Sequence, residues 1–212
     1  MQSRIKDTGI ELLIVFGIGG LIGTLIAWTS NAYVSGIEFF TALRENHSIF
    51  EITLAGSQFE LTSLIFLWIA AAFVILIRRV FGVVRWHGPA DSIYHAQQSK
   101  EPLDIKHGIA STLTAFTSAA GGGSVGQYGP LVHFGATLGI VVKRFISSRL
   151  SHEVYLGCGV AAAISAGFGA PIAGIVFAHE AILRHCSVRA TAPIAIASVT
   201  ASAVSQAFFS HS

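Results

Sequence analysis

Long hydrophobic stretches alternate with short polar segments along the chain. Residues 10–37 and 61–84 are each long enough for a helix that crosses a bilayer, which takes about 20 apolar residues. Residues 191–209 form another stretch of similar length near the end of the chain. The pattern therefore predicts a first helix hairpin of two full-length spans and a separate last span.

Two further apolar regions are interrupted by glycine. Residues 108–145 contain the uncharged, glycine-rich stretch 119–135, and residues 153–184 break at 167–171. The pieces on either side of each break are too short to cross a bilayer alone. Short hydrophobic helices that meet at glycines are typical of the discontinuous helices of transporters. We therefore predict two broken helix pairs, each of which enters the membrane and returns.

The polar segments predict the connections between these helices. Residues 38–61 carry several glutamates and are expected to form a polar loop. Residues 85–107 form a second polar connection, in which Gly88-Pro89 indicates a turn or the start of a helix. A short amphipathic helix over about residues 90–98 is expected to follow.

Composition supports a membrane protein. Of the 212 residues, 52% are hydrophobic and 11% are charged, and the mean hydropathy is +0.66. Soluble domains carry roughly 25% charged residues. The first apolar stretch is too long for the core of a signal peptide, so we interpret it as a span. The sequence predicts one multi-pass, all-α membrane domain over residues 1–212, with no nucleotide site, no metal site and no cofactor.

The basic residues fall mainly on one side of this predicted topology. If the N-terminus is cytoplasmic and each broken pair goes in and returns, Arg44 is the one basic residue outside. This asymmetry follows the positive-inside rule, which predicts a cytoplasmic N-terminus, an outside C-terminus and, in a bacterium, the inner membrane. The predicted cytoplasmic residues are Arg4, Lys6, Arg78, Arg79, Arg85, Lys100, Lys106, Lys143, Arg144, Arg149, Arg184 and Arg189.

Four glycines in the first span, within the segment GIGGLIG over residues 17–23, have two interpretations. The segment superficially resembles a dinucleotide-binding fingerprint, but that motif needs a preceding strand and a soluble βαβ unit. Small residues in a membrane helix more often allow another helix to approach closely. We therefore expect these glycines to mark a helix–helix contact.

Few side chains could support covalent chemistry. Cys158 and Cys186 fit no metal-binding spacing, and both are expected to be free, buried thiols. Ser124 with His133 or His179 could form an intramembrane hydrolase, but no acidic residue that would orient the base is recognisable. Hydrogen-bonded packing is the favoured role for both histidines, and the sequence is not predicted to be an enzyme.

The glycine-rich stretch 119–135 is the strongest candidate for a binding site. Its glycines free the backbone, and Pro130 stands where a new helix would begin. Inside a bilayer, irregular backbone is tolerated only where protein buries it or where it lines a wet cavity. The unpaired N–H groups at a helix N-terminus would then suit an anion. A loop at the membrane surface is the alternative interpretation.

Two motifs resemble the signatures of the CLC family of chloride channels and chloride/proton antiporters. GGGSVGQYGPLVHFGATLG resembles the family pattern GREGP followed by an apolar helix. AAAISAGFGAPIAGIVFAHEAIL is similar to the second signature, an alanine-rich helix followed by FNAPLAG and a helix that ends in acidic residues. The order and spacing of both motifs fit, and the likeness covers nearly the whole chain.

The resemblance implies two inverted repeats per subunit, one anion pore per subunit and a homodimer. This chain would supply the first, N-terminal repeat, with chloride as the transported ligand rather than a cofactor. The family's second repeat brings another filter loop and a tyrosine that contacts the inner anion. The alternative to a transporter is therefore an incomplete, non-conducting half-subunit, or one that needs a second polypeptide for the missing repeat.

The resemblance assigns the filter to Gly126, Gln127, Tyr128, Gly129 and Pro130. Tyr128 stands where the family has its gating glutamate, so it becomes the gate position. A carboxylate can occupy an anion site when charged and leave it when protonated, whereas a phenol stays neutral at physiological pH.

The inner proton-relay glutamate of the family's exchangers matches Ala181, one residue after Glu180. The carboxyl group expected at that position is therefore missing as well. With neither carboxylate present, the expected transport is passive rather than proton-coupled. For Glu180 itself, an ion pair with Arg184 at i+4 is as reasonable as a functional role.

A first filter loop, GSGIP in the family, would lie just before the short helix near residue 90. The chain offers Gly88, Pro89, Ser92 and Ile93 here, in an order that differs from the family motif. Ser92 could donate a hydrogen bond to an anion, whereas Asp91 beside it would repel one. Capping of the short helix is the favoured role for Asp91.

Overall fold

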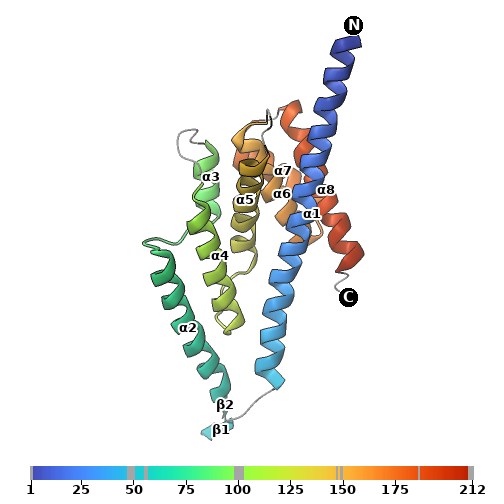
Figure 1. Ribbon diagram of the computed structural model, residues 1–212. Coiled ribbons are helices and arrows are strands. Elements are labelled where there is room, and N and C mark those ends of the chain that lie inside the picture. Colours follow the sequence, from blue (N-terminus) through green and yellow to red (C-terminus); the bar gives the residue numbers. More distant parts are fainter. Residues whose placement is uncertain are drawn as a thin grey trace.

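The computed structural model describes residues 2–46, 51–54, 57–97, 103–146, 148, 150–185 and 187–209. Within these ranges the chain forms eight α-helices, one π-helical segment and one two-stranded antiparallel hairpin (Figure 1). In chain order they are α1 (Gln2–Asn46), β1 (Glu51–Leu54), β2 (Ser57–Glu60), α2 (Leu61–Phe81), α3 (Pro89–Gln97), α4 (Ile105–Ala120), α5 (Tyr128–Phe145), α6 (His152–Phe168), α7 (Pro171–Phe177), η1 (Ala178–Leu183) and α8 (Val188–Phe208).

Within the described ranges, three helices are long and apolar enough to cross a membrane. They cover Ile14–Asn46 within α1, Thr62–Phe81 within α2 and Arg189–Phe208 within α8. The 45 residues of α1 span on the order of 65 Å, about twice the hydrocarbon core of a bilayer. Figure 1 shows α1 running along nearly the whole height of the molecule.

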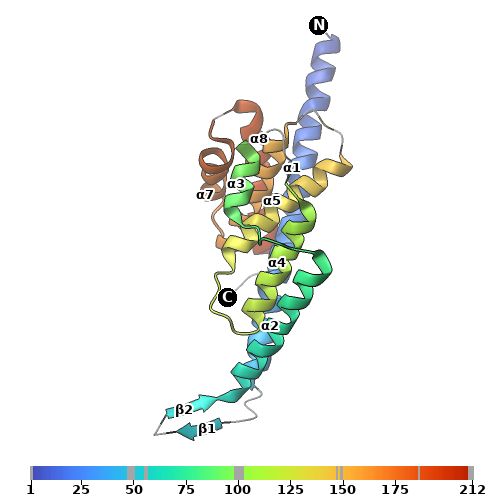
Figure 2. The ribbon, with the colours of Figure 1, turned by 90° about the vertical axis from the view of Figure 1, so that its left-hand side faces the viewer.

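The region predicted as a polar loop, residues 38–61, is more ordered than expected. Helix α1 continues to Asn46, and β1 and β2 then form a hairpin that projects beyond the helices in Figure 2. Tertiary contact accounts for the longer helix, because the ring of Phe40 lies 6.2 Å from the ring of Phe116 on α4. Tyr33 packs on the same ring at 5.5 Å.

Helix α2 lies apart from α1. It packs mainly on α4 and barely contacts α1, so the two helices do not pack as a tight hairpin. Thr62 and Ala70 are its only buried residues among those whose side chains are described. Trp68 is 77% exposed, and many other apolar side chains of this helix are exposed to a smaller extent. This helix therefore presents an apolar surface that lipid or another chain must cover.

Helix α6 forms the centre of the molecule. Every residue from Val154 to Ser165 is buried, and α5, α1, α7 and α8 pack around it. Its contact with α5 is close enough to exclude side chains, because a Cβ atom on Gly135 would lie 2.5 Å from the carbonyl oxygen of Gly159. A Cβ atom on Gly159 would overlap the carbonyl of Gly135 in the same way. Close packing between these helices thus depends on a pair of facing glycines.

The glycines of the segment GIGGLIG mark a helix contact, as predicted. A Cβ atom on Gly19 would lie 2.9 Å from the carbonyl oxygen of Pro193 on α8, and one on Gly23 would lie 2.5 Å from that of Ala197. Gly17 and Gly20 face open space. Two of the four glycines therefore allow α1 and α8 to approach.

The second broken pair turns at Gly169 and ends in a π-helix. Gly169 caps α6 with φ of 62°, a left-handed conformation that glycine adopts without strain, and α7 begins at Pro171. The helix widens into η1 at Ala178 and stops at Arg184, which has φ of 57°.

The expected ion pair between Glu180 and Arg184 does not form. Arg184 Nη1 instead donates to Gln97 Oε1 at 3.3 Å, and the Glu180 side chain is exposed. The π-helix accounts for the difference, because its wider turn removes the i+4 register on which the pair depended.

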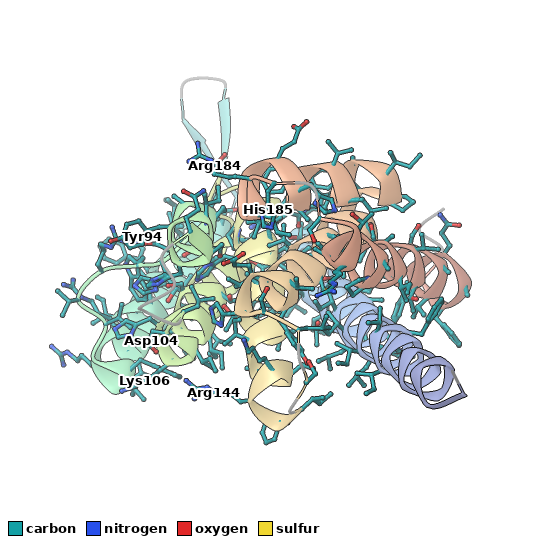
Figure 3. All side chains as sticks on the ribbon, turned by 90° about the horizontal axis from the view of Figure 1, so that it is seen from above. Tyr94, Asp104, Lys106, Arg144, Arg184 and His185 are labelled. Atoms are coloured by element: carbon teal, nitrogen blue, oxygen red, sulfur yellow. The ribbon has the colours of Figure 1, made fainter. Side chains whose placement is uncertain are left out.

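Basic residues are segregated along the molecule. Figure 3 looks onto the end from which α1 starts and labels Lys106, Arg144 and Arg184 there. Arg44 lies in the last turn of α1, which Figure 1 places at the opposite end. Lys106, Arg144 and Arg184 thus lie at one end of the fold and Arg44 at the other.

We expect Gly23→Ala to destabilise the protein and Gly20→Ala to leave it nearly unchanged. The added methyl at position 23 would collide with the backbone of α8, and overpacking of this kind costs about 1–3 kcal/mol. At position 20 nothing lies within 4 Å, so alanine adds only helix propensity. Thermal unfolding of both variants in the same detergent measures the difference. Equal unfolding temperatures would contradict the close α1–α8 contact.

Asp104 stabilises the start of α4 in a pH-dependent way. Its carboxylate accepts from Lys106 N at 2.9 Å and from His107 N at 3.4 Å, and it lies 2.5 Å from His107 Nδ1. Burial alone would raise the pKa of this carboxyl, but the hydrogen bonds from His107 and Lys106 outweigh it and lower the pKa. A carboxyl with a lowered folded pKa stabilises the fold above its unfolded pKa, and this stabilisation disappears as the pH falls through the folded pKa.

Asp104→Ala should therefore lower the free energy of unfolding by about 1 kcal/mol at neutral pH, the usual cost of losing an N-cap. The difference from the unmodified protein should shrink as the pH falls below the ordinary range of aspartate. Ser151→Ala is the matched control, because Ser151 is the N-cap of α6 and makes no side-chain capping bond. A constant difference from neutral to acidic pH would refute the role of the charged carboxyl.

Candidate functional site

The two predicted filter loops meet in the structure. Helix α3 begins at Pro89 and α5 begins at Tyr128, and the two helices are in contact. A Cβ atom on Gly129 would lie 3.7 Å from Pro89 Cγ. Pro89 lines two separate cavities. The candidate site therefore lies where the starts of α3 and α5 meet.

The first of these, the Tyr128 cavity, is apolar and has a volume of about 520 Å³. The Tyr128 ring stacks on Phe168, with ring centroids 4.2 Å apart and planes 29° apart. Among the described residues, no carboxylate and no cationic side chain lines it. Its lining residues come from the starts of α3 and α5 and from the α6–α7 turn: Pro89, Tyr128, Gly129, Val132, Ile164, Phe168, Ala170, Ala173 and Phe177.

The second, the His133 cavity, has a volume of about 280 Å³ and a mainly apolar surface that includes several polar residues. It lies between the start of α3, one face of α4 and the start of α5. Hydroxyl and imidazole groups dominate its polar lining. The lining residues are Trp86, His87, Gly88, Pro89, Ser111, Thr112, Thr114, Ala115, Ser118, Val125, Pro130 and His133.

His133 and Ser92 form a buried hydrogen-bonded pair beside this cavity. Ser92 Oγ lies 2.7 Å from His133 Nδ1, and the two residues are 0% and 1% exposed. The predicted site residue Ser92 thus contacts a histidine rather than facing the Tyr128 cavity. Ile93, predicted beside it, is partly buried and packs against the hydrophobic core.

Asp91 caps α3, as the sequence predicted. Its Oδ2 accepts from Gly88 N at 2.8 Å, and its Oδ1 pairs with Arg85. The Asp91 carboxylate, in the first turn of α3, thus accepts a hydrogen bond from the backbone N–H of the residue before the helix, as the acidic residue of a capping box does. Both carboxylate oxygens are therefore engaged, and Asp91 is not among the residues that line either cavity.

The rest of the glycine-rich stretch is an exposed turn that leads into α5. Gly122 has φ of 92° and lies against the guanidinium of Arg44. Gly126 is exposed, and Gln127 precedes α5 without making a side-chain capping bond. The start of α5 at Tyr128 therefore has no side-chain cap. Gly129 lines the Tyr128 cavity, whereas Pro130 lines the His133 cavity.

The inner position, Ala181, lies on η1. Phe177, which lines the Tyr128 cavity, precedes it on the same helical run. Glu180 beside it is exposed and Ala181 is partly buried. Neither Glu180 nor Ala181 is among the residues that line the Tyr128 cavity.

The other reactive side chains are engaged in packing. His179 Nε2 lies 3.2 Å from Thr191 Oγ1, and its Nδ1 lies 3.3 Å from the carbonyl of His185. With His133 bonded to Ser92, neither histidine is hydrogen-bonded to Ser124, so the hydrolase alternative gains no support. Cys158 is a free, buried thiol as predicted, whereas Cys186 lies outside the described residues.

Sequence reasoning missed the His133 cavity and two of its residues, His87 and Thr114. A signal was present in the sequence, because Ser111, Thr114 and Ser118 are spaced by three and four residues and therefore share one helix face. That stripe predicts a polar surface on α4. The partners that close it into a cavity come from distant segments.

Comparison with known proteins identifies related sequences. The family model described as voltage gated chloride channel matches residues 69–212. A chloride channel protein described as ClcB-like in Ralstonia nicotianae is 29% identical over 114 residues, which are 51% of this chain and 27% of that protein. The voltage-gated ClC-type chloride channel ClcB of Yersinia pseudotuberculosis is 21% identical over 184 residues, which are 86% of this chain and 44% of that protein.

A solved structure shares the fold. The crystal structure of a CLC-type fluoride/proton antiporter superposes with a TM-score of 0.74 at 21% identity, covering 94% of this chain and 48% of that one. The predicted all-α membrane fold is therefore confirmed, with a short β-hairpin added in one connection. The chain spans less than half of the length of each of these three proteins.

Ser92→Ala should destabilise the protein by about 1–3 kcal/mol, because it leaves the buried His133 Nδ1 without its partner. Ser124→Ala is the matched control, since Ser124 is exposed and its loss should change the free energy of unfolding by less than about 0.5 kcal/mol. Chemical unfolding of both variants in detergent provides the measurement. If both variants unfold at the same denaturant concentration, the Ser92–His133 hydrogen bond does not contribute to the free energy of unfolding.

Proposed function

The chain belongs to the voltage gated chloride channel family, and from this membership we propose that it mediates passive transport of chloride across the membrane. Members of this family are channels and transporters rather than enzymes. Chloride is the proposed substrate because the related sequences are named as chloride channels. The setting we propose is a bacterial inner membrane with the N-terminus in the cytoplasm, supported by the basic residues gathered at one end of the fold.

One observation carries the passive mechanism. Tyr128 stands at the start of α5, at the position where the resemblance puts the gating glutamate, and it lines a cavity with no carboxylate. A neutral phenol cannot exchange places with an anion by gaining and losing a proton at physiological pH. Its stacking on Phe168 holds it at the cavity wall, where it can act as a steric gate or donate a hydrogen bond through its hydroxyl.

The inner end supports the same proposal. Ala181 offers no group that could carry a proton, and the adjacent Glu180 is exposed rather than directed into the Tyr128 cavity. In this proposal the filter consists of Gly126, Gln127, Tyr128, Gly129 and Pro130, with the start of α3 beside it. The backbone N–H groups at the uncapped start of α5 would attract the anion.

A second candidate function is that of a half-subunit that conducts only with a partner. Apolar side chains on one face of the α6–α7 region are uncovered, with Phe168 56% exposed and Ile172 76% exposed. Val176 continues this face one turn further. The Tyr128 cavity opens beside these residues, so a covering chain would also complete its wall. The proposed cover is a second copy of this chain or a polypeptide that carries a second repeat.

Chloride efflux from liposomes, with the external pH recorded in parallel, tests the first proposal. The 212-residue chain should release chloride without moving protons, because both positions that would carry them lack a carboxyl group. Tyr128→Glu should make the efflux pH-dependent. Tyr94→Glu is the matched control, since Tyr94 is exposed on α3 and lines neither cavity, and it should leave the pH profile unchanged.

Proton movement in fixed ratio to chloride would contradict passive transport. An unchanged pH profile in an active Tyr128→Glu protein would contradict the gate assignment. No release from protein shown to be folded and inserted would favour the half-subunit. Release restored only by a co-reconstituted second-repeat polypeptide would then establish it.

A further inference from the structure

We propose that His87 and His107 form an acid-sensitive contact, which joins two walls of the His133 cavity at neutral pH and separates when a second proton enters the pair. His87 belongs to the connection between α2 and α3, and His107 lies in the first turn of α4. The proposal concerns the conformation of this connection, so it does not depend on whether the chain transports chloride.

The two imidazole rings stack on each other. Their centroids lie 5.1 Å apart and their planes are 23° apart. The backbone N of His87 also donates to Ser111 Oγ at 2.8 Å, which ties the same residue to α4 one turn after His107. Both the segment 86–89 and α4 line the His133 cavity. The stacked rings and the Ser111 hydrogen bond therefore hold two walls of this cavity together.

The pair accommodates one positive charge. His107 Nδ1 lies 2.5 Å from Asp104 Oδ2, so a proton on His107 is balanced by the carboxylate. Although burial alone would raise the pKa of Asp104, its hydrogen bonds lower that pKa, so the carboxylate stays charged over the pH range in which histidines titrate. A neutral His87 ring that stacks on this group brings no second charge into the contact.

A proton on His87 is less well balanced. The residue is partly buried, and its Nδ1 is buried without a hydrogen-bond partner among the described residues. Burial lowers the pKa of His87; the Asp91 carboxylate opposes this effect, but the neighbouring basic groups add to it. The ionisable groups around the ring are Arg85, Asp91 and His95 from the connection and α3, Asp104 and His107 from the start of α4, and His133 from α5, whose ring centroid lies 6.2 Å away.

Acid should therefore weaken the contact. A histidine whose folded pKa is lowered contributes stability that is complete above its unfolded pKa and disappears as the pH falls through the folded pKa. As the pH falls below about 6.5, the ordinary pKa of histidine, a second proton places two like charges in one stack. The Ser92–His133 hydrogen bond and the Asp91 cap keep the start of α3 in place. The expected movement is limited to the residues between α2 and Gly88.

Trp86 reports on this movement, because it directly precedes His87 and is 38% exposed. In a Trp28→Phe, Trp68→Phe background it is the only tryptophan left of the three in the sequence. Its fluorescence is quenched with acrylamide, an uncharged quencher, in the full chain in detergent at constant ionic strength. The quenching constant should increase in one step between neutral and mildly acidic pH, with a midpoint below about 6.5.

His87→Gln and His107→Gln should each abolish the step, because a single imidazole cannot form the doubly charged stack. His107→Gln is the more informative variant, since His87 beside Trp86 would still titrate in it. His185→Gln is the matched control and should keep the step, because His185 is exposed, lies at the same end of the fold as Asp104 (Figure 3) and bonds through Nδ1 to the carbonyl of Leu183.

Quenching that does not change with pH in the parent protein would overturn the proposal. A step that persists in His107→Gln would overturn it as well, because the connection would then respond to His87 without the stack. Circular dichroism and thermal unfolding identify any variant that fails to fold, and the His107 side chain is 27% exposed, so His107→Gln keeps the test valid if His87→Gln fails. Tyr128→Phe should keep the step whether or not the chain conducts chloride, which separates this outcome from that of the transport proposal.

Discussion

A bilayer offers no water to the backbone, so a helix that ends inside it must have its polar ends covered by protein. The rest of this fold depends on that constraint. Helix α6 meets it, because it is buried over Val154–Ser165 and lies between the two breaks in the chain. The facing glycines Gly135 and Gly159 bring α5 against it closely enough to exclude side chains. Close backbone contact at these glycines thus adds to the side-chain packing of the core that holds the interrupted helices.

The two cavities differ in chemistry although they share one wall. Pro89 lines both, yet one side of it is aromatic and apolar while the other carries imidazoles and hydroxyls. The difference follows from the helices that close each space. The α6–α7 turn contributes Phe168 to the first, and the hydroxyl stripe of α4 contributes Thr114 to the second. A single helix start thus separates two environments of different polarity.

Local sequence signals predicted the features that depend on local sequence. The long spans follow from apolar length, a close helix contact at GIGGLIG from its glycines, and the cap on α3 from Asp91. The partner of the glycine contact, α8, could not be predicted in this way. The family resemblance assigned filter residues to the starts of α3 and α5, but the contact between these two starts is a finding of the structure, since no periodicity joins residues so far apart. The assignment of filter roles to those residues remains a proposal.

Features that depend on distant partners escaped prediction. The extension of α1 to Asn46 rests on contacts with Phe116, which lies in another helix. The His133 cavity needs three elements to converge, and only the stripe on α4 is visible in the sequence. Ser92 and His133 are 41 positions apart, so their hydrogen bond could not be predicted from the spacing of residues along the chain.

Because of the π-helix η1, the position of a residue in the sequence and its position around the helix no longer correspond as they would in an α-helix. The resemblance assigns the proton-relay position to Ala181 by counting residues along the chain. Each turn of the π-helix η1, however, is wider than an α-helical turn and contains about one residue more. The wider turn is confined to this segment and ends at Arg184, which has a left-handed backbone conformation. A residue number within Ala178–Leu183 therefore fixes a place in the sequence without fixing a helix face. Equivalence across relatives in this segment has to be judged by superposed backbones, with a one-residue gap permitted.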